Sequence, residues 1–427
     1  MRNVALAVLV GLTGSCARCG GANQGATDAP VAASIAPPPG ARCALVAHHL
    51  VGGLGGDADA ESPVAYGAEL GGVAHDAQAF HVGYRSAGSG GEPGVMRVPF
   101  DGATPTRVSG AVWAKRQGAR APRVAIDGKG SLLVGALHRE GDELSLELFE
   151  GAASRGILRQ GVDDSEVTAI VATAKGTLVA WDDVVDEKGK PARGRVHVTA
   201  WNRVRGVPPD AGSDASTDLV AGAPTTDAHS PLLVASPDGT RAALLYLAER
   251  PEDVDDHDGG AGEPSQDHAQ RWIEVVLVDT ATGTLLGAPR ALTKETGHAQ
   301  TMAATWSESG LYVVVRDDAR PSDGDGGTLV AVRVVVGAAL EEPTRRVVAD
   351  KDVAPGLASI VPIPGGVLVS FLGLDGRARL VPSFVETATT LEPVLDHRRI
   401  VGARGPIVLA TKLVGSALDL GVVRCSW

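Results

Sequence analysis

The sequence of 427 residues predicts an all-β fold built from one repeated antiparallel unit. Two observations lead to this prediction. After residue 60 the chain shows short β-type runs and no long helical period. In addition, one pattern recurs, in which a small-residue run, a Gly-containing turn and a bulkier alternating run follow one another. The composition, with 44% hydrophobic and 21% charged residues, excludes a fibrous or wholly disordered chain.

Residues 1–19 indicate an export signal. A short basic start precedes nine apolar or small residues, which suit the core of a signal peptide and are too few to span a bilayer. The segment LTGSC at residues 12–16 resembles a bacterial lipoprotein box, with its Leu four residues before the Cys instead of three. This resemblance implies lipidation of Cys16; the alternative is an ordinary cleaved signal. We expect an exported protein of the periplasm, outer membrane or cell surface, with this anchor as its only membrane contact.

Residues 20–41 consist almost entirely of Gly, Ala, Pro, Ser and Thr. They lack the large apolar side chains that a core requires, so we expect a flexible linker. The folded domain is then expected to cover residues 42–427 as a single domain.

Seven copies of the hairpin pattern follow the linker. The Gly before each bulkier run is expected to adopt a positive φ, which tight hairpin turns require and only Gly takes without cost. In the first copy Gln78 stands at this position. In the other six copies the residues are Gly130, Gly176, Gly239, Gly310, Gly366 and Gly405.

The spacing of the copies defines the architecture. From residue 78 to residue 405 the six steps average about 55 residues, and most copies are followed by a third β-type run and often a short fourth. Four antiparallel strands in such a repeat predict a seven-bladed β-propeller. The small residues of each first run then lie where the innermost strands crowd together. The alternative is a pair of β-sandwiches.

One turn carries a family resemblance. The segment SPDGT at residues 236–240 resembles the hairpin of bacterial propellers such as the periplasmic component of the Tol system. At the level of pattern, residues 42–427 resemble the broad seven-bladed, WD-repeat-like propeller superfamily. The resemblance implies the fold and leaves the function open, because propellers host many activities.

The ring needs one more strand to close. The last copy ends with strands at 406–413 and 417–425, and the run at 42–51 can supply the missing strand, since an unclosed ring leaves exposed edges. Cys43 and Cys425 then fall on adjacent strands of one blade. They are the only cysteines in the predicted domain, and an exported compartment permits oxidation. We expect the disulfide Cys43–Cys425.

Three acidic loops are predicted on the top face, where the second strand of a blade connects to the third. They cover residues 182–194, 249–270 and 317–327, and the middle one contains eight carboxylates. One interpretation is solvated insertions; the other is a cation site or a surface for a basic partner. The spacing does not match an EF-hand loop. The candidate Ca²⁺ ligands are Asp253, Asp255, Asp258, Asp323 and Asp325.

The connector at residues 111–123 is basic. It contains Lys115, Arg116, Arg120 and Arg123 beside Trp113, so it can hold an anion or carboxylate, or its charges are solvated. The histidines of the first hairpin and of the closing strand have no zinc-site spacing, and we interpret them as packed or surface groups. They are His48, His49, His75 and His81.

No nucleophile motif or phosphate loop occurs in the chain, and the net charge of −12 leaves no surface for a nucleic-acid backbone. We therefore expect a monomeric binding scaffold of the cell envelope, with a protein or small ligand on its top face and no cofactor other than possible Ca²⁺. Two alternatives remain open. One is a hydrolase or lyase acting on an extracellular polymer at the top of the channel, and the other is a Ca²⁺-stabilised surface module.

Overall fold

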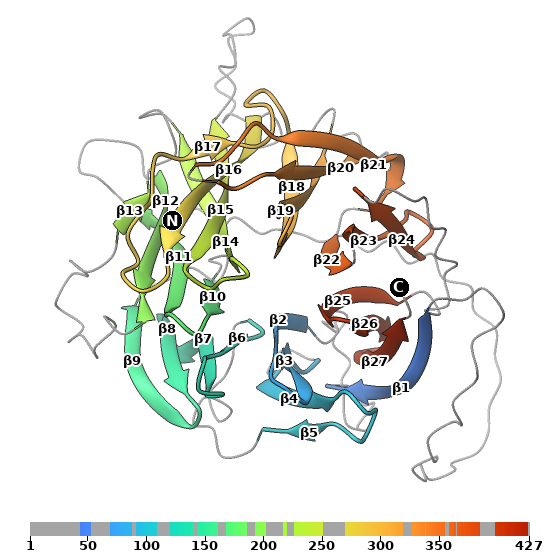
Figure 1. Ribbon diagram of the computed structural model, residues 1–427. Helices are drawn as coiled ribbons and strands as arrows, with labels where there is room; N and C mark the ends of the chain where they lie inside the picture. The colour runs from blue at the N-terminus through green and yellow to red at the C-terminus, as the bar shows by residue number, and fades with distance from the viewer. Residues whose placement is uncertain are drawn as a thin grey trace, which may run out of the picture. The chain divides into compact units, whose positions relative to one another are not determined.

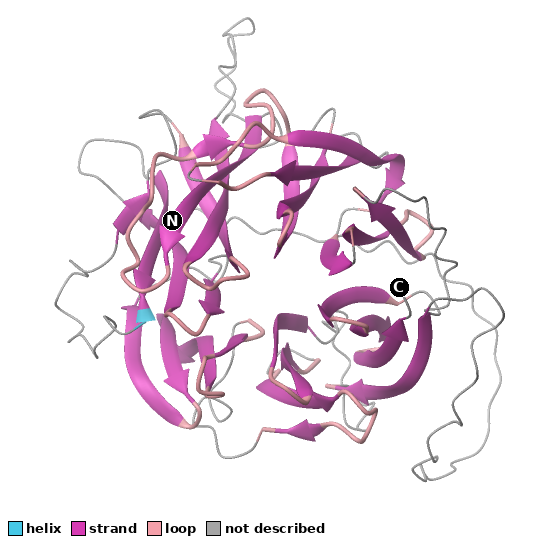
Figure 2. Ribbon diagram, viewed as in Figure 1, coloured by secondary structure: helices cyan, strands magenta, loops and turns pink. Residues whose placement is uncertain are grey.

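Seven antiparallel sheets are arranged around a common axis as the blades of a β-propeller (Figure 1). Strands make up almost all of the regular structure (Figure 2). In the described residues no helix is long and apolar enough to cross a membrane. All described residues belong to one unit of the chain, 34–427. The computed structural model describes residues 43–52, 69–87, 91–108, 120–140, 143–160, 168–185, 193–201, 217–219, 226–250, 270–318, 327–337, 339–354, 358–363, 365–384 and 398–425.

Blades one to three take their strands in chain order from the innermost to the outermost. Blade one contains β2 (Glu69–His75), β3 (Ala79–Arg85), β4 (Pro93–Pro99) and β5 (Thr106–Arg107). Blade two contains β6 (Arg123–Ile126), β7 (Leu132–Glu140), β8 (Glu143–Glu150) and β9 (Ala153–Gln160). Blade three contains β10 (Thr168–Ala172), β11 (Thr177–Val185), β12 (Arg193–Ala200) and β13 (Thr217–Leu219).

Blades four to six follow the same order, and blade six has three strands within the described residues. Blade four contains β14 (Asp227–Ala235), β15 (Arg241–Arg250), β16 (Gln270–Asp279) and β17 (Arg290–Ala291). Blade five contains β18 (Ala299–Ser307), β19 (Gly310–Asp317), β20 (Gly327–Val334) and β21 (Thr344–Val353). Blade six contains β22 (Ser359–Ile363), β23 (Gly366–Leu372) and β24 (Ala378–Ser383).

Blade seven combines the two ends of the described chain. It contains β25 (Arg399–Arg404), β26 (Ile407–Val414) and β27 (Ala417–Cys425), and β1 (Cys43–Val51) pairs with β27 as the outermost strand (Figure 1). Cys43 lies directly opposite Cys425, and the two are joined by a disulfide. The predictions of a seven-bladed propeller, of its closure by an N-terminal strand and of the disulfide are therefore confirmed.

The predicted turn glycines are only partly correct. Positive φ is found at four of the six, Gly130, Gly239, Gly310 and Gly405. In blade six the left-handed residue is Gly365 instead of Gly366. Gly176 has no positive φ; it is required because a Cβ there would lie 2.1 Å from the carbonyl oxygen of Thr280.

Crowding near the axis explains the small residues of the innermost strands. A Cβ at Gly71 in β2 would lie 2.2 Å from the carbonyl oxygen of Pro122, and one at Gly83 in β3 would lie 2.0 Å from the same oxygen. The N–H of Gly72 donates a hydrogen bond to that oxygen at 3.1 Å. Blade one therefore accepts the segment leading into β6 only because these positions lack side chains.

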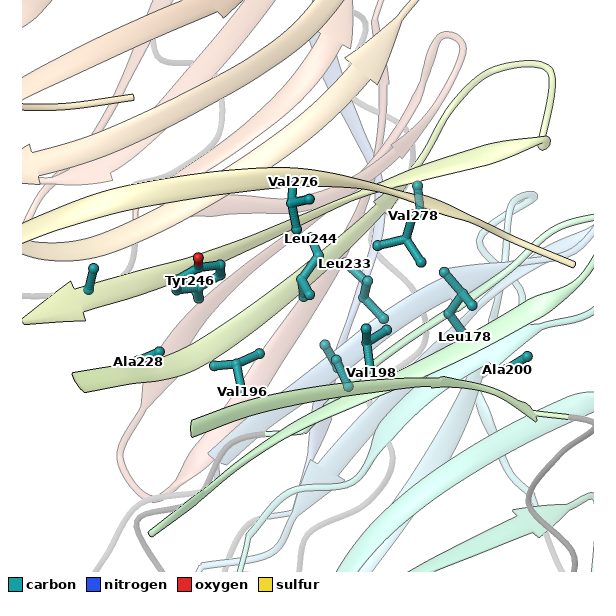
Figure 3. Packing of buried hydrophobic residues seen from close by; sticks show 14 of the residues in the cluster. Leu178, Val196, Val198, Ala200, Ala228, Leu233, Leu244, Tyr246, Val276 and Val278 are labelled. Atoms are coloured by element: carbon teal, nitrogen blue, oxygen red, sulfur yellow. The ribbon is translucent and has the colours of Figure 1, made fainter. Parts of the chain in front are cut away.

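The hydrophobic core lies between neighbouring blades. Figure 3 shows the interface of blades three and four, where side chains from β11 and β12 meet side chains from β14, β15 and β16. Alternating residues of each strand contact the blade on either side, because successive side chains point to opposite faces of a sheet. The labelled residues of this interface are Leu178, Val196, Val198, Ala200, Ala228, Leu233, Leu244, Tyr246, Val276 and Val278.

Blade seven also contains a buried ion pair. Arg398, immediately before β25, contacts Asp419 in β27, and their side chains are 2% and 4% exposed. Gly421 makes room for this arginine, since a Cβ there would lie 3.0 Å from Arg398 Cδ. His48 Nδ1 in β1 lies 3.3 Å from Asp419 Oδ1, so the closing strand also reaches this carboxylate.

Candidate functional site

The three acidic loops have their ends at the same end of neighbouring blades. We call this the top end, defined as the end at which the second and third strands of a blade are connected and the chain enters the next blade. Residues 182–194 connect β11 to β12, 249–270 connect β15 to β16, and 317–327 connect β19 to β20. The prediction that these loops share one face of three adjacent blades is therefore consistent with the strand order.

Most of the predicted ligands lie outside the described residues, and this is true of all five candidate Ca²⁺ ligands. Within the described residues no group of three or more His, Cys, Asp or Glu side chains could hold a metal ion. The residues that fall outside are Cys16, Trp113, Lys115, Arg116, Asp253, Asp255, Asp258, Asp323 and Asp325.

Glu249 is the central residue at the top end of blade four. It lies at the end of β15, where the longest acidic loop begins. His229 Nε2, from the innermost strand β14, lies 3.2 Å from Glu249 Oε2. Arg271 Nε, from β16, donates a hydrogen bond to the same oxygen at 2.8 Å. The carboxylate therefore joins the three inner strands of the blade at their top ends.

This environment keeps Glu249 ionised. Burial alone would raise the pKa of the carboxyl group, but the hydrogen bond with His229 and the positive charge of Arg271 outweigh it and lower the pKa to about 2. The side chains are partly exposed, 18% for Glu249 and 32% for His229. At neutral pH Glu249 is a fixed anion and an acceptor, and it has no proton to donate.

The neighbouring residue Ser230 has a strained backbone. Its φ is 56°, and a β-bulge shifts the register of β14 between His229 and Leu232. The N–H of Ser230 donates to Asp182 Oδ2, in β11 of blade three, at 2.7 Å. Bulges re-aim side chains and are frequent beside functional sites, and strained residues persist where surrounding contacts hold them. This strain therefore marks the top end of β14 as a candidate site.

The same linkage continues into blade five. The N–H of Arg271 donates to the carbonyl oxygen of Gly297 at 2.8 Å, and Arg271 forms a parallel bridge with His298. The N–H of His298 donates to Asp317 Oδ1, at the end of β19, at 2.9 Å. Hydrogen bonds thus connect the top ends of three blades. We call this set the rim network; its members are Asp182, His229, Ser230, Glu249, Arg271, His298 and Asp317.

A second ion pair supports the end of β19. Arg316 Nε donates to Asp318 Oδ1 at 2.8 Å, with side chains 6% and 12% exposed. Burial raises the pKa of Asp318, and the charge of Arg316 opposes that shift. The third acidic loop therefore also begins at a position held by buried charges.

The sequence indicates the acidic loops but not the rim network. Its contacts join residues 19 to 48 positions apart, and none of them forms a local motif. The only sequence signal was the position of the acidic loops. The sequence therefore indicates the strand ends at which the acidic loops begin, but it does not indicate the hydrogen bonds that fix those ends.

The other predicted histidines have structural surroundings. In the first hairpin the side chain of His81 is 10% exposed and lies 2.9 Å from Asp76 Oδ2. Burial alone would raise the pKa of Asp76, but hydrogen bonds from His81 and the turn backbone lower it to about 2. Burial lowers the pKa values of His75 and His49. These contacts agree with their interpretation as packed or surface groups.

Comparisons with known proteins show the fold. No protein-family model matches the chain, and no curated protein matches it. A puromycin-hydrolysing peptidase of Mycobacterium tuberculosis is similar in structure, with a TM-score of 0.51 and 17% identity over 80% of this chain. This chain covers 49% of that peptidase, about half its length. The similarity, at this low identity, supports the propeller fold alone.

Two further solved structures are similar at lower scores. A protein of unknown function from Dyadobacter fermentans has a TM-score of 0.45 and 9% identity, covering 91% of this chain and 100% of that one. The β-propeller domain of the Trilobed protease from Pyrococcus furiosus also has a TM-score of 0.45 and 9% identity, covering 83% of this chain and 95% of that one.

Proposed function

We propose that the protein is an exported binding scaffold, and that the top ends of blades three to five bind a positively charged partner. The observation that supports this most is the rim network. It holds the ends of three carboxylate-rich segments at fixed positions on adjacent blades, through Asp182, Glu249 and Asp317. A rigid base reduces the entropy lost when charged segments order against a partner.

The ionised state of Glu249 in the rim network favours binding over acid–base catalysis. Glu249, with a pKa of about 2, stays ionised across physiological pH. Asp182 and Asp317 accept backbone N–H groups of neighbouring segments. A general acid or base needs a pKa near the working pH and access to a substrate proton. Glu249 instead provides a permanent negative charge at the rim.

A charge-matched comparison tests the proposal. A lysine-rich peptide labelled with a fluorophore is titrated with the wild type, with Asp253→Asn/Asp255→Asn/Asp258→Asn, and with Glu308→Gln/Glu341→Gln/Asp350→Asn. The last variant removes three exposed charges outside the top-face loops. We expect only the first variant to weaken binding, by about fivefold or more, and added salt to weaken binding by the wild type. Equal affinities for the two variants would reject the top face as the binding surface.

Calorimetry with Ca²⁺ on the same proteins tests the alternative of a Ca²⁺-stabilised surface module. A Ca²⁺-stabilised surface module requires heat of binding that is lost in the Asp253→Asn/Asp255→Asn/Asp258→Asn variant, because Ca²⁺ prefers carboxylate oxygens. Heat no greater than that of buffer rejects the metal site and leaves the peptide result to decide the partner.

Export and anchoring are part of the proposal. The signal-like segment and the lipoprotein-like box at residues 12–16 support them, and the disulfide Cys43–Cys425 suits an oxidising compartment. Labelling with a fatty-acid analogue in a bacterial host tests the anchor. We expect label on the wild type and on Cys19→Ser, and none on Cys16→Ser. Label that is retained on Cys16→Ser would reject the assignment.

A second candidate function is a hydrolase or lyase at the top of the axis. The strained Ser230 beside His229 favours it, because strained backbone clusters at active sites. Chromogenic peptides and glycosides test it, with the wild type compared with His229→Ala. Turnover that the variant loses would establish the enzyme; turnover by neither protein supports the scaffold.

A further inference from the structure

Exposed apolar side chains gather at the top ends of blades six and seven. Leu374 lies in the connection between β23 and β24. Leu413 and Val414 end β26, and Leu50 lies in β1 opposite Asp419, near the start of β27. We call Leu374, Leu413, Val414 and Leu50 the apolar tips; they are 47%, 61%, 43% and 62% exposed. Neighbouring exposed hydrophobic residues mark interaction surfaces, whereas single ones are normal.

Hydrogen bonds fix the apolar tip of blade six. The N–H of Leu374 donates to the carbonyl oxygen of Asp352, at the end of β21 in blade five, at 3.0 Å. The N–H of Gly373 donates to the carbonyl oxygen of Arg377 at 2.9 Å and closes the turn. Within this turn, Asp375 Oδ1 accepts the N–H of Arg377 at 3.1 Å. The turn therefore holds Leu374 at a fixed position in the solvent.

The apolar tip of blade seven is a tight hairpin. Val414 lies opposite Ala417, and Gly415 between them has a φ of 58°, which a two-residue turn requires. Leu413 lies opposite Leu418, which is 4% exposed. The hydrophobic row of this blade therefore continues beyond the core to an exposed leucine. Apolar groups on fixed turns lose little conformational entropy when a partner covers them.

The apolar tips adjoin the acidic part of the top end. Gly327, where the third acidic loop ends, pairs with Val353 in β21. Val353 in turn forms an antiparallel bridge with Gly373, the residue before Leu374 (Figure 1). The same loop begins at Asp317, which belongs to the rim network. A partner that covers the top ends of blades three to five therefore meets Leu374 next along the ring.

The charge of this face distinguishes the occupants that an apolar surface could have. A bilayer with anionic lipids, or a second copy placed top end to top end, would bring negative charge against Glu249 and the carboxylate-rich loops. A protein segment with lysine or arginine residues and apolar side chains matches both the acidic blades and the apolar tips. Charge complementarity therefore favours such a segment over the other two occupants.

We propose that the partner of the top end is an amphipathic protein segment, whose basic residues face blades three to five and whose apolar residues cover the apolar tips. This inference rests on the proposed function, which accounts for the basic residues, and it adds the apolar ones. Positive charge steers the partner to the acidic blades, and the burial of leucine and valine side chains on blades six and seven adds affinity and orientation.

Two fluorescent peptides of equal length and charge test the proposal. The first contains only lysine and serine; in the second, a block of serines is replaced by leucines. We expect the wild type to bind the leucine peptide about tenfold more tightly than the serine peptide. We expect Leu374→Ser/Leu413→Ser to remove most of that difference and to leave the affinity for the serine peptide unchanged. Because the difference comes from apolar contact, added salt should weaken the binding of both peptides without removing it.

The matched control is Leu286→Ser/Val335→Ser, which replaces two exposed apolar residues of blades four and five away from their top ends. It should bind both peptides as the wild type does, and circular dichroism confirms that each variant is folded. A leucine peptide that binds no more tightly than the serine peptide, or an equal loss in both double variants, would overturn this inference. Binding of the serine peptide would then still support the proposed function, whereas binding of neither peptide would overturn both.

The two other occupants have tests of their own. The full chain with Cys16→Ser, which lacks the predicted anchor, is sedimented with vesicles of phosphatidylcholine and phosphatidylglycerol, and its mass is measured by analytical ultracentrifugation. We expect neither vesicle binding nor a dimer that depends on the apolar tips. Vesicle binding or a dimer that Leu374→Ser/Leu413→Ser abolishes would overturn the proposal and assign the apolar tips to a lipid surface or to a second copy.

Discussion

Asp182 in blade three accepts the backbone N–H of Ser230 in blade four, at 2.7 Å, and Ser230 is held there at a φ of 56°. The contact crosses the blade interface at the top end. We expect Asp182→Ala to destabilise the fold by about 1–2 kcal/mol, because it removes the acceptor of this N–H. Asp182→Asn keeps an acceptor oxygen and is expected to restore most of that loss in thermal unfolding.

Ser230→Gly is the matched test of strain. Glycine adopts positive φ without steric cost, so this change is expected to stabilise the fold by up to about 1 kcal/mol. A lower melting temperature for Ser230→Gly would show that the serine side chain contributes more than its backbone strain costs.

The low pKa of Glu249 predicts acid sensitivity. In the unfolded chain the carboxyl group titrates near its ordinary value of 4.5, and in the folded protein near 2. As the pH falls, the unfolded chain binds the proton first, so the stabilisation is complete above about pH 5 and is lost as the pH falls towards 2. We expect Glu249→Gln to reduce stability at pH 7 by about 1–3 kcal/mol and to flatten the dependence between pH 5 and 2.

Chemical denaturation at several pH values measures this difference. The difference in unfolding free energy between wild type and Glu249→Gln is expected to shrink as the pH is lowered through that window. A difference that stays constant from pH 7 to pH 2.5 would contradict the assignment.

The disulfide Cys43–Cys425 joins cysteines 382 residues apart. Closing so long a loop in the unfolded chain corresponds to about 6 kcal/mol as an upper estimate. We expect Cys43→Ser/Cys425→Ser to lower the melting temperature, and a reductant to lower that of the wild type alone. Mass spectrometry without reduction should find the linked peptides, and two free thiols would contradict the bond.

Gly83 is predicted to be intolerant of any side chain. A Cβ would lie 2.0 Å from the carbonyl oxygen of Pro122, so Gly83→Ala must displace the segment leading into β6. We expect a loss of about 1–3 kcal/mol. Gly337→Ala is the control, because the nearest atom to its Cβ is a flexible Glu341 oxygen at 3.9 Å. Equal stability of both variants would show that the backbone yields easily here.

The repeat spacing and the orphan strand at 42–51 were sufficient to predict seven blades, ring closure and the Cys43–Cys425 bond. These features depend on the periodicity of the sequence and on the number of strands, and both can be read from the order of residues without knowing which distant residues are in contact. The turn glycines were less predictable, because a position such as Gly176 is required by a neighbouring blade at Thr280 rather than by its own turn.

The candidate site was harder to predict for a related reason. Each contact in the rim network crosses between strands or blades, so the partners of Glu249 are set by register and by the order of blades in the ring. No pattern in the sequence points to His229. The contact between His229 and Glu249 depends on a β-bulge in β14 that the residue pattern does not predict.

Blade seven also determines when the ring is completed. β1 is synthesised before every other described strand and its partner β27 after them, so the seventh sheet cannot be completed until β27 has been synthesised. A product truncated before β27 would retain unpaired strand edges at β1 and β26, which invite proteolysis and aggregation. Completion of the ring therefore depends on synthesis of the chain through β27, and the disulfide Cys43–Cys425 then links the first and last described strands.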